Sequence, residues 1–312
     1  MPASPILLLL LALTSIALGP RPAAADLPRD LDGYVLLAED MLFLGSNGVV
    51  ESGHVGVNQA PGIFAKIGER TRLEDGSALA GSRVLLDAAS SVGDVFVNDL
   101  ATQPSSTIRG AVETFGTTPI LLHDPLPAFA PSKVKVDVPS GGWLELAPGS
   151  YGRVQVRKAA TLVLSGGLYD VDDLKVLDDA SVRAAGPVEL RVGRRLRLNS
   201  RVFIGPLPGS GLGSGDIRIV TGARTIRVGQ SFTMIGRLFA PVGWFNSRNA
   251  LTVSGQLVAR RIQLHPGATL RLTADVGPPP TPGATPTSSP GATPTPATTP
   301  TSAATPTPTA IA

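Results

Sequence analysis

Cysteine is absent from the 312 residues of this chain, and histidine occurs only 3 times. The lack of cysteine excludes a disulfide framework, and it leaves no cysteine to carry a lipid anchor behind an export signal. His54, His123 and His265 are far apart in the sequence, so no pair has the spacing of a zinc site and none marks a catalytic triad. We therefore predict no catalytic residue, no metal site and no cofactor.

Helical periodicity is also scarce, and aromatic residues make up only 4% of the chain. Gly209 to Gly215 has the glycine spacing of a nucleotide-binding loop, but it lies between two short apolar runs and no helix follows it. We interpret this segment as a simple loop. A body without disulfides or helices must be stabilised by apolar packing and by backbone hydrogen bonds between strands.

The two ends of the chain differ in composition from its middle. Ile6–Leu13 is an unbroken apolar run and Ala23–Ala25 supplies small residues for cleavage, which predicts a secretory signal peptide over residues 1–25. This run is shorter than the roughly 20 residues that span a bilayer. Residues 277–312 are almost all Pro, Thr, Ala, Ser and Gly, which predicts a disordered tail. We expect a secreted or cell-surface protein with no membrane span after cleavage.

Between these ends, short apolar runs alternate inward and outward positions with a period of two, as in Leu196-Arg-Leu198. The runs also repeat. Leu146–Tyr151 is similar to Leu164–Tyr169, 18 residues later, and Ala160–Leu164 is similar to Ala180–Ala184, 20 residues later. A repeat of this length corresponds to one coil of a solenoid.

The repeat predicts an all-β fold, a right-handed parallel β-helix in which like residues stack in ladders from coil to coil. We expect one ladder to contain Val156, Val176 and Leu196, and we expect Tyr151 to stack on Tyr169. An antiparallel sandwich or jelly roll also has many short strands and is the alternative fold, although neither requires a fixed repeat.

The pattern divides the body into three segments. An irregular N-terminal β-helical region over residues 26–116 precedes a proline-rich connecting loop over residues 117–140, because proline removes a donor from a strand ladder. A regular β-helix over residues 141–276 follows. The sequence leaves open whether the two regions form one continuous solenoid. Three bulky residues of the regular region are expected to stack between coils or to cap an end: Trp143, Trp244 and Phe245.

Charge is divided unevenly between the two regions. Residues 26–140 carry 8 basic and 15 acidic side chains, whereas residues 141–276 carry 18 basic and 9 acidic ones. Opposite charges favour head-to-tail association of copies, and the basic half favours an envelope polysaccharide or another polyanion. The competing interpretation is that these outward charges are simply solvated. Nucleic acid is not expected, because no aromatic residues interleave the arginines.

The densest basic cluster lies in the regular region. In Arg195-Leu-Arg197-Leu198 the apolar residues point inward, so both arginines point outward, and Lys175 is expected one coil below Arg195. The predicted polyanion-binding face consists of Lys175, Arg191, Arg195, Arg197 and Arg201.

Carboxylates gather in one stretch of the same region. Paired carboxylates act as acid and base in glycoside hydrolysis and also bind calcium, so a polysaccharide lyase or hydrolase is the alternative function. Acidic residues on either side of the strand Leu174–Val176 are, however, typical of turns, and no histidine accompanies them. The carboxylates are Asp170, Asp172, Asp173, Asp178 and Asp179.

The segments Leu146–Val156 and Ala160–Tyr169 resemble uncharacterised secreted right-handed β-helix surface proteins of bacteria. Gly236–Pro241 followed by Gly255–Ile262 is similar to the last coils of those proteins, and more distantly to bactofilin-like and choice-of-anchor proteins. This resemblance covers the regular region. It implies a β-helical fold with a structural role, and it transfers no catalytic residues.

A second similarity involves the N-terminal region. Tyr34–Ala38 with Gly53–Val57 is similar to the start of secreted ice-binding β-helix proteins, which implies an ice- or surface-binding face. Those proteins often carry ordered threonines, and no predicted strand here contains Thr-X-Thr. The sequence therefore favours an exported noncatalytic β-helical scaffold or adhesive protein of the bacterial cell envelope, with ice or surface binding as a further alternative.

Overall fold

The computed structural model describes residues 31–58, 64–114 and 126–273. These residues form a parallel β-solenoid of about 11 turns. Every strand pairing among them is parallel, which confirms the predicted parallel β-helix and excludes the sandwich and the jelly roll, because those folds are antiparallel. The predicted signal peptide and the predicted disordered tail lie outside the described residues.

The N-terminal region begins with a short 3-10 turn and continues with short strands: η1 (Leu31–Gly33), β1 (Tyr34–Leu44), β2 (Val49–Ser52), β3 (His54–Val57), β4 (Phe64–Ile67), β5 (Arg72–Leu73), β6 (Ala78–Leu86), β7 (Ser91–Val92), β8 (Asp94–Thr102), β9 (Thr107–Ile108) and β10 (Val112–Glu113). The C-terminal region contains β11 (Lys135–Val138), β12 (Trp143–Leu146), β13 (Gly149–Val156), β14 (Thr161–Leu164), β15 (Gly167–Val176), β16 (Ser181–Ala184), β17 (Val188–Leu198), β18 (Phe203–Pro206), η2 (Ser214–Asp216), β19 (Ile217–Thr221), β20 (Thr225–Val228), β21 (Thr233–Ser247), β22 (Thr252–Leu264) and β23 (Thr269–Arg271).

Each inner coil contributes a short stretch of strand to each of three faces, here named A, B and C. In one coil, residues 167–171 of β15 lie on face A, residues 173–176 lie on face B, and β16 lies on face C. Alternate side chains of all three faces point into one continuous core that extends through both regions. Burying each of its Leu, Ile and Val side chains contributes about 1.5–3 kcal/mol to folding.

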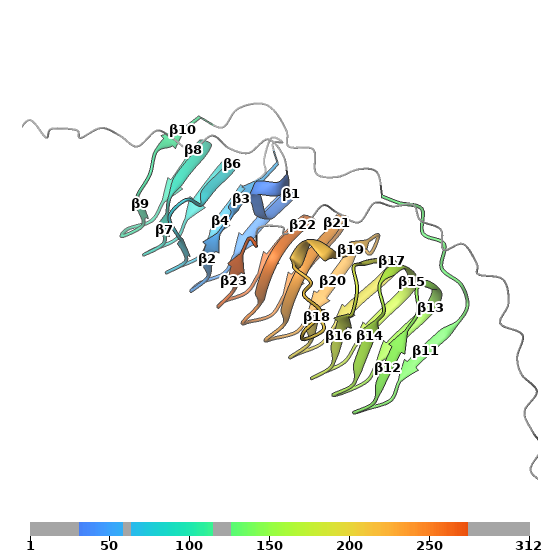
Figure 1. Ribbon diagram of the computed structural model, residues 1–312. Coiled ribbons are helices and arrows are strands. Elements are labelled where there is room, and N and C mark those ends of the chain that lie inside the picture. Colours follow the sequence, from blue (N-terminus) through green and yellow to red (C-terminus); the bar gives the residue numbers. More distant parts are fainter. Residues whose placement is uncertain (1–30, 59–63, 115–125, 274–312) are drawn as a thin grey trace, which may run out of the picture. The chain divides into compact units, whose positions relative to one another are not determined.

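The coils are not stacked in the order of the sequence. β1 pairs with β22 and β2 pairs with β23, so the first coil of the chain lies on the last one (Figure 1). From this junction the N-terminal region extends to one end of the stack at β9 and β10. The C-terminal region begins at the opposite end with β11 and β12 and returns to the junction. The two regions therefore form one continuous solenoid.

The described part of the connecting loop corrects one predicted boundary. Lys135–Val138 forms β11 on face B, although residues 117–140 were predicted to be a loop. The strand begins after Pro131 and contains no proline, so every residue keeps its backbone N–H. Its side chains alternate between outward and inward positions, as in the other strands.

The predicted ladders are partly in a different register. Val156 pairs with Val176 as expected, but Val176 pairs with Leu198 rather than Leu196. The coil that contains β17 has one extra residue in the turn before this strand and another at the corner between faces A and B. Paired residues of β15 and β17 on face B are therefore 22 positions apart in the sequence instead of 20. The predicted tyrosine stack is also wrong, since Tyr169 pairs with Gly149 and Tyr151 pairs with Val171.

A second ladder runs along the turns between faces B and C. One residue of each turn has a left-handed backbone, and in most turns its N–H donates to a turn carbonyl of the neighbouring coil, as between Ala250 and Pro266 at 3.0 Å. The ladder crosses the junction, because Gly267 N–H donates to Ser46 and Asn47 N–H to Glu69. The left-handed residues are Asn47, Arg70, Ala89, Ser105, Gly141, Ala159, Asp179, Arg201, Ser231, Ala250 and Gly267.

Most of these left-handed positions carry a β-carbon, which is strained in this conformation. Ala250 has a φ of 59° and an exposed side chain, so replacing it with glycine removes strain without removing packing. We expect Ala250→Gly to raise the free energy of unfolding by about 1 kcal/mol. Urea denaturation followed by circular dichroism measures the change.

The control is Ala147→Gly, at an exposed position whose φ is not positive. There glycine only adds entropy to the unfolded chain, so we expect a loss of up to about 1 kcal/mol. A loss of stability in both variants would contradict the strain argument.

Candidate polyanion-binding cleft

Strand pairing between two coils is interrupted at the corner between faces A and B. β17 pairs with β19 as far as Thr221 and with β20 from Ile226 onward, and no pairing links the corner residues in between. A cleft of about 500 Å³ lies on the surface along this corner. Five of its nine lining residues are arginines, so we name it the arginine cleft. Its lining consists of Gly193, Arg194, Arg195, Leu196, Arg197, Gly222, Arg224, Thr225 and Arg227.

Glycine allows the two coils to approach closely beside the cleft. A β-carbon on Gly222 would lie 2.9 Å from the carbonyl oxygen of Gly193, closer than such atoms come in proteins. Phe129 lies against the same two glycines, with its ring 3.1 Å from that position on Gly222. Phe129, from the described part of the proline-rich segment, therefore lies at this corner.

The arginines of face B are displayed by simple strand alternation. Arg197 lies between the buried residues Leu196 and Leu198, and Arg227 lies between the buried Ile226 and Val228. Arg197 pairs with Arg227 in the backbone register, so both guanidinium groups point outward from neighbouring coils. Neighbouring strands are about 4.8 Å apart, so the positive charges lie close together.

Four arginines of the cleft are free to bind a ligand. Arg194 is neutralised, because its guanidinium lies 3.0 Å from both Asp172 and Asp173. The other four are exposed and have no carboxylate within 4.0 Å among the residues that the structure describes: Arg195, Arg197, Arg224 and Arg227. An exposed guanidinium without a partner offers a planar set of donors to a carboxylate, sulfate or phosphate.

The structure brings together three of the five predicted site residues. Lys175, Arg195 and Arg197 lie on face B, but Lys175 pairs with Arg197, and Asp173 rather than Lys175 pairs with Arg195. Arg191 instead lies on face A, where its Nε is 2.6 Å from Glu189. Arg201 lies in a turn and is bound to Asp179.

Arg224 and Arg227 were not predicted. Arg227 follows Arg197 by 30 residues, because the intervening coil contains a long loop and η2, and a search at the repeat length misses it. The sequence does contain a signal, since Ile226-Arg-Val228 has the same alternation as Leu196-Arg-Leu198.

An aromatic residue stands on the same face beyond the cleft. Trp244 pairs with Thr225, which lines the cleft, and its side chain is 39% exposed. This position corrects the prediction that Trp244 stacks between coils or caps an end, because its side chain points outward from an inner coil. Phe245, the next residue, is fully buried in the core, and Trp143 is 63% exposed on the end strand β12.

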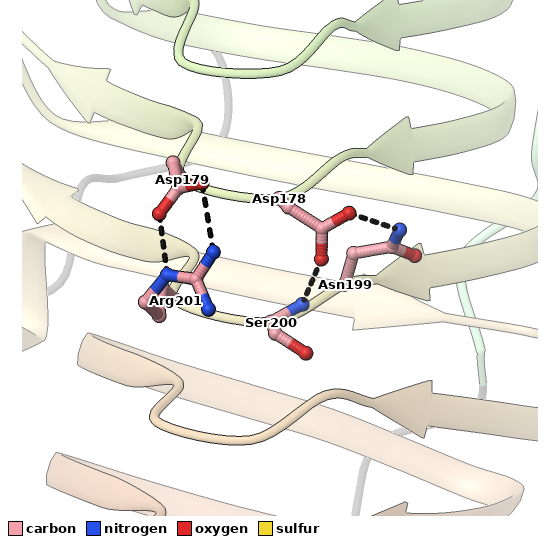
Figure 2. A network of polar contacts seen from close by, with 5 residues as sticks. All are labelled: Asp178, Asp179, Asn199, Ser200 and Arg201. Atoms are coloured by element: carbon pink, nitrogen blue, oxygen red, sulfur yellow. Dashed lines mark hydrogen bonds and ion pairs between the residues drawn. The ribbon is translucent and has the colours of Figure 1, made fainter.

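Asp178 and Asp179 hold their turn to the turn of the neighbouring coil. Figure 2 shows Asp178 accepting hydrogen bonds from the backbone N–H of Ser200 at 3.0 Å and from Asn199 at 3.3 Å. Asp179 binds Arg201 of the same neighbouring turn, and this pair lowers the pKa of the Asp179 carboxyl. Asp178 and Asp179 lie in a turn, as predicted, whereas Asp172 and Asp173 lie within β15 and correct the prediction of a turn before Leu174.

Asp170 is separated from the other carboxylates. It lies on face A, pairs with Arg191 in the register and is 9% exposed. Burial raises the pKa of its carboxyl, and the positive charge of Arg191 opposes this shift. One of its oxygens, Oδ1, has no hydrogen-bond partner. The five predicted carboxylates therefore do not converge in a single groove.

The isolated His54 has a structural contact. Its Nδ1 accepts a hydrogen bond from the backbone N–H of Ala78 at 3.0 Å, and burial lowers the pKa of its ring. Within the described ranges, no cluster of three or more His, Asp or Glu side chains has the geometry to hold a metal ion. The same residues include no helix that is long and apolar enough to cross a membrane.

Comparison with family models and with curated proteins finds no match. Among solved structures, the chain is similar to an ice-binding protein from an Antarctic biological consortium, with 12% sequence identity and a TM-score of 0.31. The alignment covers 81% of this chain and 94% of that one. The resemblance to bactofilin-like and choice-of-anchor proteins stays a prediction from the sequence.

The buried Asp170 carboxyl predicts a pH dependence. Its pKa is raised in the folded protein, so ionisation costs stability, and this cost grows as the pH rises from the unfolded pKa of about 3.9 through the folded value. We expect Asp170→Asn to raise the urea midpoint at pH 7. The gain should shrink as the pH falls through the folded pKa, because wild-type Asp170 then becomes protonated.

Asp172→Asn is the matched control, because Asp172 is partly exposed and paired with Arg194. We expect it to leave the midpoint unchanged or to lower it. A loss of stability at pH 7 in Asp170→Asn would show that the attraction to Arg191 outweighs the burial cost.

Proposed function

We propose that this protein is an exported, noncatalytic β-helical scaffold of the bacterial cell envelope that adheres to an acidic polysaccharide. The observation that carries this proposal is the arginine cleft, in which four exposed guanidinium groups without carboxylate partners line about 500 Å³. Keeping this many like charges together costs free energy through mutual repulsion, and an anionic ligand removes that cost.

The ligand class follows from the geometry of the donors. Arg197 and Arg227 stand on successive coils, and Lys175 continues the same column on the other side of Arg197. A flexible polymer with repeated carboxylate or sulfate groups can contact several of these cations at once. Each contact is a charge-assisted hydrogen bond, which is stronger than a neutral one.

Trp244 adds a reason to favour a sugar polymer over a simple anion. Its exposed ring lies one coil beyond Thr225 at the edge of the cleft, where it offers a flat apolar surface for the face of a sugar ring. A polymer that binds the arginines and continues along face B would reach this ring.

The proposed location follows from the sequence. The apolar run Ile6–Leu13 and the small residues Ala23–Ala25 support secretion, and the lack of cysteine suits a protein whose stability comes from stacked coils. A rigid stack of coils also supports an adhesive face, because neighbouring coils fix the spacing of its charges.

The test is binding of the purified protein to immobilised heparin, to polygalacturonate and to neutral dextran. We expect binding to the two polyanions, weaker binding at high salt, and no binding to dextran. The double variant Arg197→Glu/Arg227→Glu should lower the affinity for both polyanions about tenfold or more, because it replaces attraction with repulsion at the centre of the column.

The control is Arg248→Glu/Arg271→Glu, which makes the same change in net charge at exposed positions outside the cleft. Its affinity should stay within about twofold of the wild type. Asp173→Asn should bind more tightly, because it removes a carboxylate from Arg194 and Arg153. An equal loss in the control, or the appearance of shortened polymer chains during incubation, would contradict the proposal.

One observation favours the second candidate, binding to ice or to another ordered surface. Thr233, Thr252 and Thr269 pair in successive coils on face C, so their outward hydroxyl groups form a row across strands rather than within one strand. We expect, under this candidate, a gap between the melting and freezing temperatures of ice in the presence of the protein. Thr252→Lys should abolish the gap without changing polyanion binding, and the absence of any gap in the wild type would remove the candidate.

A further inference from the structure

Both ends of the described stack have strands with one open edge. In the parts of the chain that the structure describes, β11 pairs only with β13, β12 only with β14, and β9 only with β7. The carbonyls of Val134 and Val138 accept hydrogen bonds from the β13 coil. In a parallel strand, the N–H and C=O groups of successive residues point alternately to the two neighbouring strands. The N–H and C=O groups of Lys135 and Asp137 therefore face the open edge.

The core is also incomplete at both ends. Val136 and Leu100 are the first and last members of one inward ladder that runs through every coil of face B. Both are only partly buried, whereas the inner members of the ladder are buried. Leu144 and Ile108 are likewise only partly buried, on face C at the two ends. Apolar surface left uncovered in this way favours association.

The two ends carry opposite charges at the matching position. Lys135 precedes Val136 at one end, and Asp99 precedes Leu100 at the other, so a second copy stacked in register places Lys135 over Asp99. Asp99 already pairs with Arg83 of the coil on its inner side, at 3.2 Å. The ladder would then alternate in charge, as it does where Asp173 lies between Arg153 and Arg195.

The junction inside the molecule shows that such docking needs no chain continuity. β1 and β22 are separated by more than two hundred residues of sequence, yet they pair over seven residue positions. An opposite-charge contact accompanies the pairing, because Asp40 lies 2.8 Å from Arg260 and 3.2 Å from Arg261. The acidic N-terminal region and the basic C-terminal region are thus in contact within one chain.

We propose that copies of this protein stack head to tail, with β11 and β12 of one copy added to β8 and β9 of the next. The contact joins two different surfaces, so it extends into an open-ended filament rather than closing as a dimer. The occupant of each open end is a second copy of this chain. This inference rests on the ends of the stack and does not depend on polyanion binding at the arginine cleft.

The test is sedimentation velocity of the full chain over a range of micromolar concentrations at low salt. We expect the sedimentation coefficient of the wild type to rise with concentration. Lys135→Glu and Asp99→Lys should each lower the association constant about fivefold, since each places like charges opposite one another. The double variant Lys135→Glu/Asp99→Lys should recover the wild-type value, because it restores opposite charges.

A backbone variant tests the same contact without relying on charge. Asp137→Pro removes an N–H that faces the open edge, whereas Asp137→Ala keeps it, and both variants lose the ion pair with Arg157. We expect Asp137→Pro to associate more weakly than Asp137→Ala.

Arg248→Glu and Glu51→Lys reverse exposed charges away from both ends and should leave association unchanged. Circular dichroism and thermal unfolding confirm that each variant is folded. A wild type that stays monomeric at every concentration, or a folded double variant that fails to recover, would overturn the proposal.

Discussion

Hydrogen bonding between successive coils is the constraint on which the rest of the structure depends. Strands of four residues, such as β14 and β16, bury too little surface to be stable alone, and they form because a coil lies on each side. The turn ladder extends this dependence beyond the strands, since residues such as Arg70 and Ser231 accept a strained left-handed backbone to donate to the next coil. The backbone conformation at these positions is thus determined by the stacking of the coils rather than by the residue's own preference.

Stacking also determines which charged side chains become neighbours on the outer surface. Side chains at equivalent positions are held about 4.8 Å apart, so like charges repel unless the ladder alternates in sign. Around Asp173 the protein alternates basic and acidic residues and the coils stay in contact. Beside the corner between β17 and β20 the ladder instead places Arg197 next to Arg227, and arginines without partners line the cleft. The cleft is therefore a local departure from the rule that governs the surrounding coils.

Much of the fold follows from the sequence, because alternation and a repeat of about one coil leave few architectures. The register is harder to derive. One extra residue in a turn or at a corner shifts every later ladder, which is why Leu198 rather than Leu196 follows Val176. The site was predicted only in part for the same reason: Arg197 belongs to a regular coil, whereas Arg227 follows an insertion that hides the period. No local sequence pattern predicts that β1 stacks on β22, because that contact depends on the path of the whole chain.

The position of the junction has a topological consequence. Gln256 donates a hydrogen bond to the carbonyl of Leu31 at 2.6 Å, and Ser52 donates to that of Leu272 at 3.0 Å, so the two ends of the described body meet in the interior of the stack. In its connectivity the body is a circular permutant of an ordinary solenoid. Joining residue 273 to residue 31 and opening the chain between residues 114 and 126 gives a polypeptide whose coils follow one another in sequence. Residues 31 and 273 therefore both lie part-way along the stack rather than at one of its ends.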